Sequence, residues 1–150
     1  MKIISQVKKL HNYRIIEKFT AGIILTGNEI KSLRNYHNSI NEAYISPQEG
    51  ELYIINMHIA AYKYSQPKNF SEVYNSKRKR KLLLHRSEIR NLIFQLKTKS
   101  YSLFPLTLFI NEKGWVKLEI VLAQHLRKYQ IKSKLKEKEI KKQLQKKEFW

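Results

Sequence analysis

The chain has 150 residues, with 30 Lys and Arg against 12 acidic residues and a formal net charge of +18. This length fits one domain, and an apolar share of 42% argues against disorder over most of the chain. So large a positive surplus predicts a polyanionic partner, with nucleic acid as the first candidate and an anionic membrane surface as the second. Because cysteine is absent, disulfides, thiolate metal sites and a Cys nucleophile are excluded.

The sequence gives little support for a membrane protein, a secreted protein, a metalloprotein or an enzyme. No apolar run approaches the length of a membrane span, and residues 1–10 hold no apolar signal core, so we expect a cytoplasmic protein and a monomer. The five His match no metal motif, Asp is absent, and no Gly-rich loop could cradle a phosphate. We therefore expect no metal, no cofactor and no catalytic residue, and keep a basic ribonuclease using His and Glu as an alternative.

The first half of the chain alternates short apolar runs with turn signals, which predicts a sheet closed into a barrel or a sandwich. Gly27 ends the first of these runs, and Asn28 is a suitable helix cap. In chain order, we predict a strand over 19–25, a short helix over 28–33, a hairpin of 44–46 and 52–57 around a turn at 47–50, and a surface loop over 62–76.

The second half begins with a basic run, Lys77–Lys81, followed by three Leu. Ser87 is the expected cap of a helix whose apolar residues fall on one face, namely Ile89, Leu92, Ile93 and Leu96. Strands over 103–110 and 115–122 are then predicted to form a hairpin around 111–114. Alternation in the second strand buries one face and leaves Lys117 on the other. The prediction is five or six strands with two helices.

The residue composition changes after residue 126. Residues 127–150 hold ten Lys and Arg against three Glu, without Gly or Pro, which favours a helix. Their apolar residues do not share one face, so such a helix has nothing to dock on a protein core. We therefore predict a folded domain over 1–124 and a basic tail over 125–150 that is disordered when free.

Three cationic segments together favour RNA over a solvated surface: the basic run, the outer sheet face and the tail. Each Lys or Arg that neutralises a phosphate releases counterions and so adds salt-sensitive affinity. Aromatic rings near these charges are candidates for stacking on bases, although each is also plausible as core or surface filler. These aromatic residues are Tyr13, Tyr36, Tyr62, Tyr74, Trp115 and Tyr129.

Four ordered blocks carry a family resemblance: Phe19–Ile23 (FTAGI), Gly27–Arg34 (GNEIKSLR), Asn56–Ile59 (NMHI) with Tyr62, and Arg80–Arg86 (RKLLLHR). Over about residues 6–132 the chain resembles the SsrA-binding protein family, also called small protein B. The resemblance implies a mainly β fold, a six-stranded antiparallel barrel of oligonucleotide-binding (OB) type, with two or three flanking helices and a basic tail.

The same resemblance implies a function without catalysis. The protein would bind the tRNA-like domain of transfer-messenger RNA (tmRNA) and deliver it to stalled ribosomes for trans-translation. Its partners would be tmRNA, the small ribosomal subunit and ribosomal RNA, and its tail would become helical in the decoding centre. The alternative is a general single-strand or ribosomal RNA-binding protein on the same barrel.

Matching motif positions implies the contact residues. Glu29 would be an acid within a basic surface that holds Lys31 or a base edge, and Leu83 would pack under the RNA face. The chain departs from the family pattern at Thr20, at Ala61 and at the 125–132 junction, where His125 replaces a hinge Gly. The implied RNA-binding residues are His11, Gly27, Glu29, Lys31, Ser32, Arg34, Lys81, Leu83, His85 and Lys117, and the implied tail residues are Arg127, Lys128, Tyr129 and Lys132.

Overall fold

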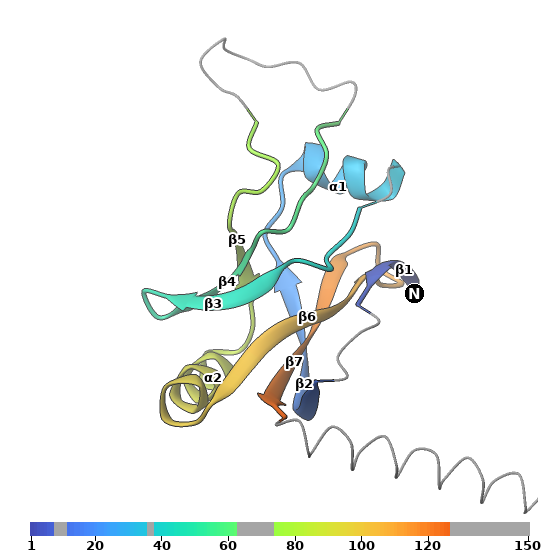
Figure 1. Ribbon diagram of the computed structural model, residues 1–150. Helices are drawn as coiled ribbons and strands as arrows, with labels where there is room; N and C mark the ends of the chain where they lie inside the picture. The colour runs from blue at the N-terminus through green and yellow to red at the C-terminus, as the bar shows by residue number, and fades with distance from the viewer. Residues whose placement is uncertain (8–11, 36–37, 63–73, 127–150) are drawn as a thin grey trace, which may run out of the picture.

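Antiparallel strands build most of the computed structural model, which describes residues 1–7, 12–35, 38–62 and 74–126 (Figure 1). Two helices accompany them. The elements in chain order are β1 (Lys2–Gln6), β2 (Tyr13–Ile23), α1 (Gly27–Asn35), β3 (Tyr44–Gln48), β4 (Glu51–Ile55), β5 (Arg80–Leu83), α2 (Arg86–Thr98), β6 (Tyr101–Ile110) and β7 (Val116–His125).

The strands are hydrogen-bonded in the order β1-β6-β3-β4-β5-β2-β7, and β7 pairs again with β6. Six strands therefore close into a ring, while β1 adds to β6 from outside. The prediction of a mainly β, antiparallel, OB-like fold with six ring strands and flanking helices is confirmed. The added strand β1 was not predicted, because Lys2–Gln6 is too short and too mixed to show strand periodicity.

The core fills the interior of the ring with aliphatic side chains from nearly every element. Leu52, Ile54, Leu82, Leu118 and Ile120 are fully buried and belong to one continuous cluster. Predicted alternation in β7 is confirmed, because Val116, Leu118 and Ile120 point inward and Lys117 stays partly exposed. The predicted face of α2 is also confirmed, since Ile89 and Leu92 are buried while Ile93 and Leu96 pack against the cluster.

The predicted hairpin of β3 and β4 forms, with a shorter turn than predicted. Both strands reach the turn, so that Gln48 pairs with Glu51 and only Glu49 and Gly50 connect them. The φ angles of these two residues are 51° and 77°. Two positive φ values in a two-residue hairpin are the mark of a type I′ turn, whose twist matches that of the strands.

Both predicted helix caps are wrong. Thr26, not Asn28, caps α1: its Oγ1 accepts from the N–H of Glu29 at 3.2 Å, and Glu29 Oε1 accepts from the N–H of Thr26 at 3.0 Å. This is a capping box, which satisfies donors at both of its ends. His85, not Ser87, precedes the first residue of α2, and its N–H donates to Glu88 at 3.2 Å.

Strand β2 begins at Tyr13, six residues before the predicted start. Its first half is largely exposed, so no alternation of apolar and polar residues marks it in the sequence. The strand forms because its backbone pairs with β7 along nearly its whole length, from Tyr13↔His125 to Gly22↔Lys117, with a bulge between Ile15 and Glu17. Most of the predicted surface loop, over 63–73, lies outside the described residues.

Neither helix in the described part of the chain has the length and apolarity needed to cross a membrane.

Candidate nucleic-acid interface

A row of outward-facing residues crosses three strands of the ring. Leu83 of β5 pairs with Gly22 of β2, and Gly22 pairs with Lys117 of β7. Gly22 carries no side chain, so bare backbone lies between an apolar and a cationic neighbour. A Cβ at Gly22 would approach the Cβ of Leu83 to 3.3 Å, so a side chain there would force Leu83 to shift.

Helix α1 adjoins this row from the side of the β6–β7 turn. The Arg34 guanidinium donates to the carbonyl of Gly114 at 3.2 Å, which joins the end of α1 to the turn. Trp115 follows this turn with its side chain 63% exposed, and the Nζ of Lys117 lies 5.4 Å from the centre of its ring. A cation over an exposed ring suits both base stacking and phosphate contact.

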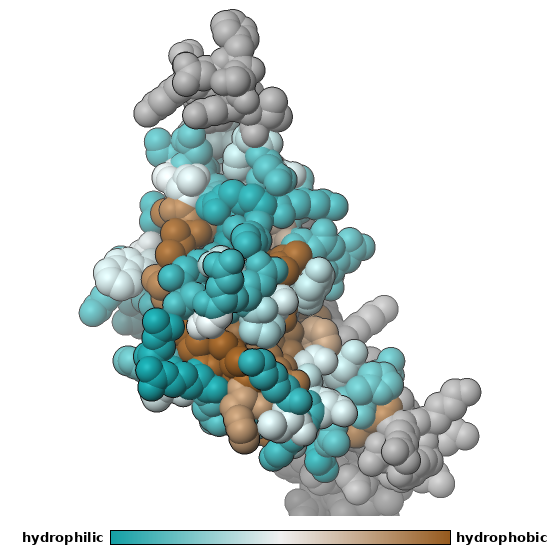
Figure 2. All heavy atoms as spheres, turned by 90° about the vertical axis from the view of Figure 1, so that its left-hand side faces the viewer, coloured by the Kyte–Doolittle hydropathy of each residue, from teal (hydrophilic) through white to brown (hydrophobic). Residues whose placement is uncertain are grey.

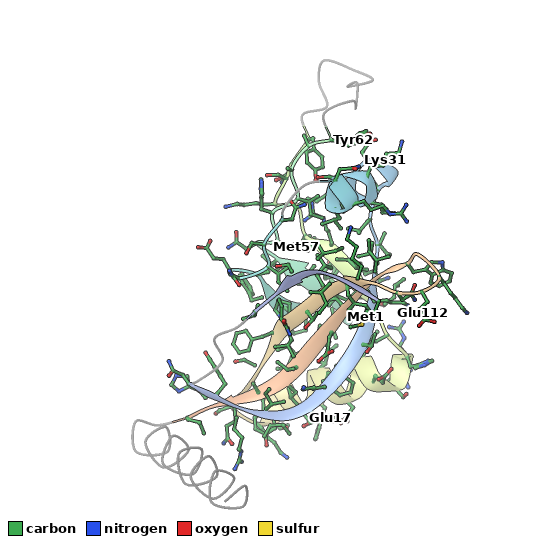
Figure 3. The ribbon with its side chains drawn as sticks, turned by 90° about the vertical axis from the view of Figure 1, so that its right-hand side faces the viewer. Met1, Glu17, Lys31, Met57, Tyr62 and Glu112 are labelled. Carbon is green, nitrogen blue, oxygen red and sulfur yellow. The ribbon has the colours of Figure 1, made fainter. Side chains whose placement is uncertain are left out.

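The exposed side of α1 carries a second cation. Figure 3 shows Lys31 beside Tyr62, and the Lys31 Nζ lies 5.7 Å from the centre of the Tyr62 ring. On β5, Lys81 faces outward like Leu83, and its Nζ lies 3.8 Å from a carboxylate oxygen of Glu51. We call the outward residues of these elements the contact face. It consists of Lys31, Arg34, Lys81, Leu83, Trp115 and Lys117, with Gly22 of β2 between β5 and β7.

Most of the predicted RNA-binding residues that the structure describes are accessible. Gly27, Lys31, Arg34, Lys81, Leu83 and Lys117 lie on or beside the contact face, and His85 is exposed where β5 passes into α2. Leu83 is 51% exposed, so the expectation that it packs beneath the RNA face is wrong. His11, Arg127, Lys128, Tyr129 and Lys132 lie outside the described residues.

Two predicted contact residues are buried. Ser32 is fully buried on the inner side of α1, and its Oγ has no hydrogen-bond partner among the described residues. Glu29 is 1% exposed and forms ion pairs with Arg78 and Arg80. The expectation that Glu29 lies in the basic surface and holds Lys31 is therefore wrong, because both arginines reach it from beneath α1.

The Glu29 carboxylate is satisfied from several directions. Arg80 Nε donates to Oε2 at 2.7 Å, the Thr26 N–H donates to Oε1, and the Tyr74 hydroxyl lies 3.1 Å from Oε2. Burial by itself would raise the pKa of Glu29, but the hydrogen bonds from Arg78, Thr26 and Arg80 outweigh it and lower the pKa below the ordinary 4.5. Glu29 is thus held as an anion inside the protein.

The sequence analysis missed this buried cluster, although two signals mark it. Thr26 and Glu29 have the spacing of a capping box. Arg80 precedes Leu82 by two residues on a strand, so it must point inward with Leu82 while Lys81 and Leu83 point outward. The hydroxyl of Tyr74, a predicted candidate for base stacking, is bound to Glu29 and to the Ile59 carbonyl, while the residue stays 39% exposed.

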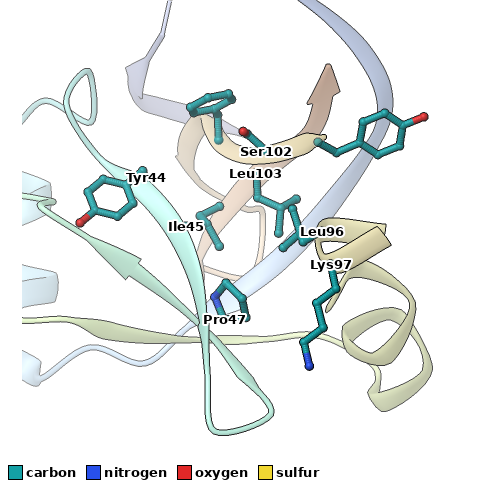
Figure 4. Close-up of a pocket in the computed structure, with 9 residues that line it drawn as sticks. Tyr44, Ile45, Pro47, Leu96, Lys97, Ser102 and Leu103 are labelled. Atoms are coloured by element: carbon teal, nitrogen blue, oxygen red, sulfur yellow. The ribbon is translucent and has the colours of Figure 1, made fainter. Parts of the chain in front are cut away.

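Two hollows lie away from the contact face, against α2. One of about 420 Å³ lies between β3, β6 and the end of α2, and Lys97 is the one charged residue among the described residues that line it (Figure 4). The other lies between Gly50 and α2, where Arg86, Arg90 and Lys97 surround Ile93 and Phe94. On this side of the molecule, Figure 2 shows apolar residues gathered between polar ones. Among the residues that the structure describes, none predicted to contact RNA lines either hollow.

A ring of antiparallel strands with cations and aromatic rings on its outer face defines a nucleic-acid-binding protein of OB-like type. Comparison with known proteins then identifies the family. The family model for SmpB protein matches residues 3–148. The chain belongs to the SmpB family.

Individual relatives agree with this assignment. The SsrA-binding protein of Wolbachia pipientis subsp. Culex pipiens is 39% identical over 140 residues, covering 93% of this chain and 91% of the relative. That of Phocaeicola vulgatus is 43% identical over 128 residues, covering 85% and 83%. A solved chain described as "tmRNA-SmpB: a journey to the center of the bacterial ribosome" is 37% identical, with a TM-score of 0.60 over 79% of this chain and 80% of that chain.

The buried position of Glu29 predicts an acid-dependent loss of stability. Because its pKa is lower in the folded chain than in the unfolded chain, its stabilisation is complete above the unfolded value of 4.5 and disappears as the pH falls through the folded value. We expect Glu29→Gln to lower the free energy of unfolding by about 3 kcal/mol at pH 7. The difference from the wild type should shrink as the pH falls from about 5 through the folded pKa of Glu29.

Urea unfolding at several pH values measures this difference. Glu17→Gln is the control, because Glu17 is exposed on β2 of the same sheet. A constant difference between the wild type and Glu29→Gln across this pH range would contradict the assignment.

Proposed function

We propose that this protein binds the tRNA-like domain of tmRNA through the contact face and delivers it to stalled ribosomes in trans-translation, as an adaptor without catalysis of its own. Relatives with 37–43% sequence identity are named as SsrA-binding proteins or described with tmRNA in the bacterial ribosome. The observation that carries the proposal is that the exposed family motif residues gather with Trp115 on one face. We expect this function to operate in the cytoplasm, with the small ribosomal subunit as the second partner.

The chemistry of the contact face suits a folded RNA. Positive charge for phosphates comes from Lys31 and Arg34 on α1 and from Lys117 on β7. Arg34 also binds the β6–β7 turn, so these cations are held near one another. Trp115 and Leu83 supply exposed apolar surface on which an unstacked base can lie. Because these groups are held in place on a helix and on β-strands, they suit a folded RNA of fixed shape better than a flexible single-stranded RNA.

We also propose that the tail acts on the ribosome rather than on tmRNA. Strand β7 continues through His125, and the buried Leu126 donates its N–H to the Asn12 carbonyl at 2.8 Å. The segment free to act as a tail therefore begins after Leu126. If this segment becomes helical on the ribosome, its ten Lys and Arg would point to all sides, which suits a channel with phosphates on every side.

Competition between two RNAs tests the function. We expect the full chain to bind a tRNA-like RNA at least tenfold more tightly, by rough estimate, than an unstructured RNA of the same length at moderate salt. Fluorescence anisotropy measures both affinities. Equal affinity would favour a general single-strand binder, and cleavage of the RNA during long incubation would favour a ribonuclease; either result contradicts the proposal.

Lys117→Ala should weaken binding of the tRNA-like RNA. We expect a loss of roughly three- to tenfold, and a decrease of about one in the slope of log affinity against log salt, because one phosphate contact is removed. Lys97→Ala on α2 is the matched control, since it removes the same charge away from the contact face. Unchanged affinity and slope for Lys117→Ala would exclude Lys117 from the interface.

Deletion of residues 127–150 should separate the two partners. The deletion leaves β7 and Leu126 intact, so affinity for the tRNA-like RNA should stay within about threefold of the wild type, measured at high enough salt to screen the tail. Rescue of stalled ribosomes in a reconstituted translation assay should be lost. An RNA affinity that falls in parallel with rescue would show that the tail belongs to the tmRNA site.

A further inference from the structure

Arg80 is fully buried, and every nitrogen of its guanidinium has an acceptor. Nε donates to Glu29 at 2.7 Å, one terminal nitrogen donates to the Met57 carbonyl at 2.6 Å, and the other donates to the Ser76 carbonyl at 3.1 Å. A planar fork with five donors is the group best able to satisfy several acceptors at once. Arg80 therefore joins α1 to the segment that follows β4 and to the segment that precedes β5.

Tyr74 completes this cluster. Its hydroxyl accepts from Arg80 at 3.2 Å and lies 2.9 Å from the Ile59 carbonyl and 3.1 Å from Glu29. The one hydroxyl proton is shared between these two acceptors. Burial and the charge of Glu29 raise the pKa of Tyr74 above its ordinary 10.0, so the hydroxyl stays protonated and able to donate.

The cluster fixes the geometry of the contact face from beneath. Glu29 lies in the first turn of α1, and Lys31 and Arg34 follow on the same helix. Arg80 points inward at the start of β5, and the next residue, Lys81, points outward. The Glu29–Arg80 pair thus joins the element that carries two cations of the contact face to the strand that carries Lys81 and Leu83.

We propose that Arg80 and Tyr74 are positioning residues for RNA binding: they hold Glu29, and through Glu29 the helix α1, in the position from which Arg34 reaches the β6–β7 turn and Lys31 lies on the contact face. This inference rests on the proposed RNA-binding function. Arg80 is inaccessible to RNA, and the role assigned to Tyr74, which is 39% exposed, belongs to its hydroxyl, which is turned into the cluster. Glu29 acts through position as well, and not by contact.

A double-mutant cycle separates position from contact. Arg80→Gln should lower affinity for the tRNA-like RNA about tenfold, within the range of interaction between neighbouring residues, because it leaves the buried Glu29 with only the partly exposed Arg78 as a cationic partner. Glu29→Gln should do the same by leaving Arg80 unpaired. The double variant Glu29→Gln/Arg80→Gln removes both charges, so its loss should be no larger than that of the worse single variant.

Trp115 reports the position of α1 without RNA. The chain has two Trp, so the measurement is made with Trp150→Phe in the full-length protein. Because Arg34 binds the carbonyl of Gly114, displacement of α1 should change the emission of the neighbouring Trp115. Arg90→Gln is the matched control: Arg90 is an exposed arginine of α2 that lines the hollow beside Gly50, away from the cluster and from the contact face. It should leave Trp115 emission unchanged and RNA affinity within about twofold.

Hydrogen exchange distinguishes a positioning role from a general loss of stability. We expect faster exchange in Arg80→Gln to be confined to 27–35 and 74–83, with β6 and β7 unchanged. Tyr74→Phe, which removes only the hydroxyl, should show the same pattern with a smaller loss of affinity, about threefold. If Arg80→Gln does not fold, Tyr74→Phe and Arg80→Lys, which keeps the charge but loses the fork, provide the same readings.

Three results would overturn the inference. The first is wild-type RNA affinity in a folded Arg80→Gln variant or, if that variant does not fold, in both Tyr74→Phe and Arg80→Lys. The second is a double variant in which the affinity losses of the two single variants multiply. The third is faster exchange throughout the sheet, in proportion to the lost RNA affinity. Failure of the wild type to bind the tRNA-like RNA would instead contradict the proposed function. In that case the Trp115 and exchange measurements would still show whether the cluster positions α1.

Discussion

The buried pair of Glu29 and Arg80 sets the position of helix α1, and the contact face depends on that position. A buried ion pair is a weak source of net stability, because the cost of removing both charges from water offsets much of their attraction. The pair instead restricts α1 to one position, because any other position would leave the buried charge of Glu29 or Arg80 unpaired at a large cost in free energy. Arg80 also satisfies backbone carbonyls before β5 and after β4, so one side chain joins three parts of the chain.

The contact face follows from this arrangement and from the register of the sheet. The pairing of β5, β2 and β7 brings Leu83, Gly22 and Lys117 into one row, although they are far apart in the sequence. The buried pair then places α1 so that Arg34 reaches Gly114 beside Trp115. Charge for phosphates and exposed apolar surface for bases therefore meet on one rigid surface, while the same chain keeps its strongest charge excess in residues 127–150.

Sequence patterns predicted the fold where burial imposes a period. The β6–β7 hairpin and the inner face of α2 were predicted because Leu118, Ile120, Ile89 and Leu92 recur at strand and helix spacing. The start of β2 was not, because backbone pairing rather than burial makes Tyr13 part of the strand. In the interface, the outward cations could be predicted, but Glu29 was assigned to the surface because it stands in the same family motif as Lys31 and Arg34. Only tertiary structure shows that Arg78, Arg80 and Tyr74 surround it.

Hydrogen exchange in the free and RNA-bound protein shows where the RNA lies, because it reports on every element at once. A saturating tRNA-like RNA should slow exchange in α1, in the backbone at 81–84 and in the β6–β7 turn at 111–117. Exchange in α2, which lies beside the two hollows, should not change. Slower exchange in α2, with the contact face unaffected, would contradict the account and place the RNA on the other side of the ring.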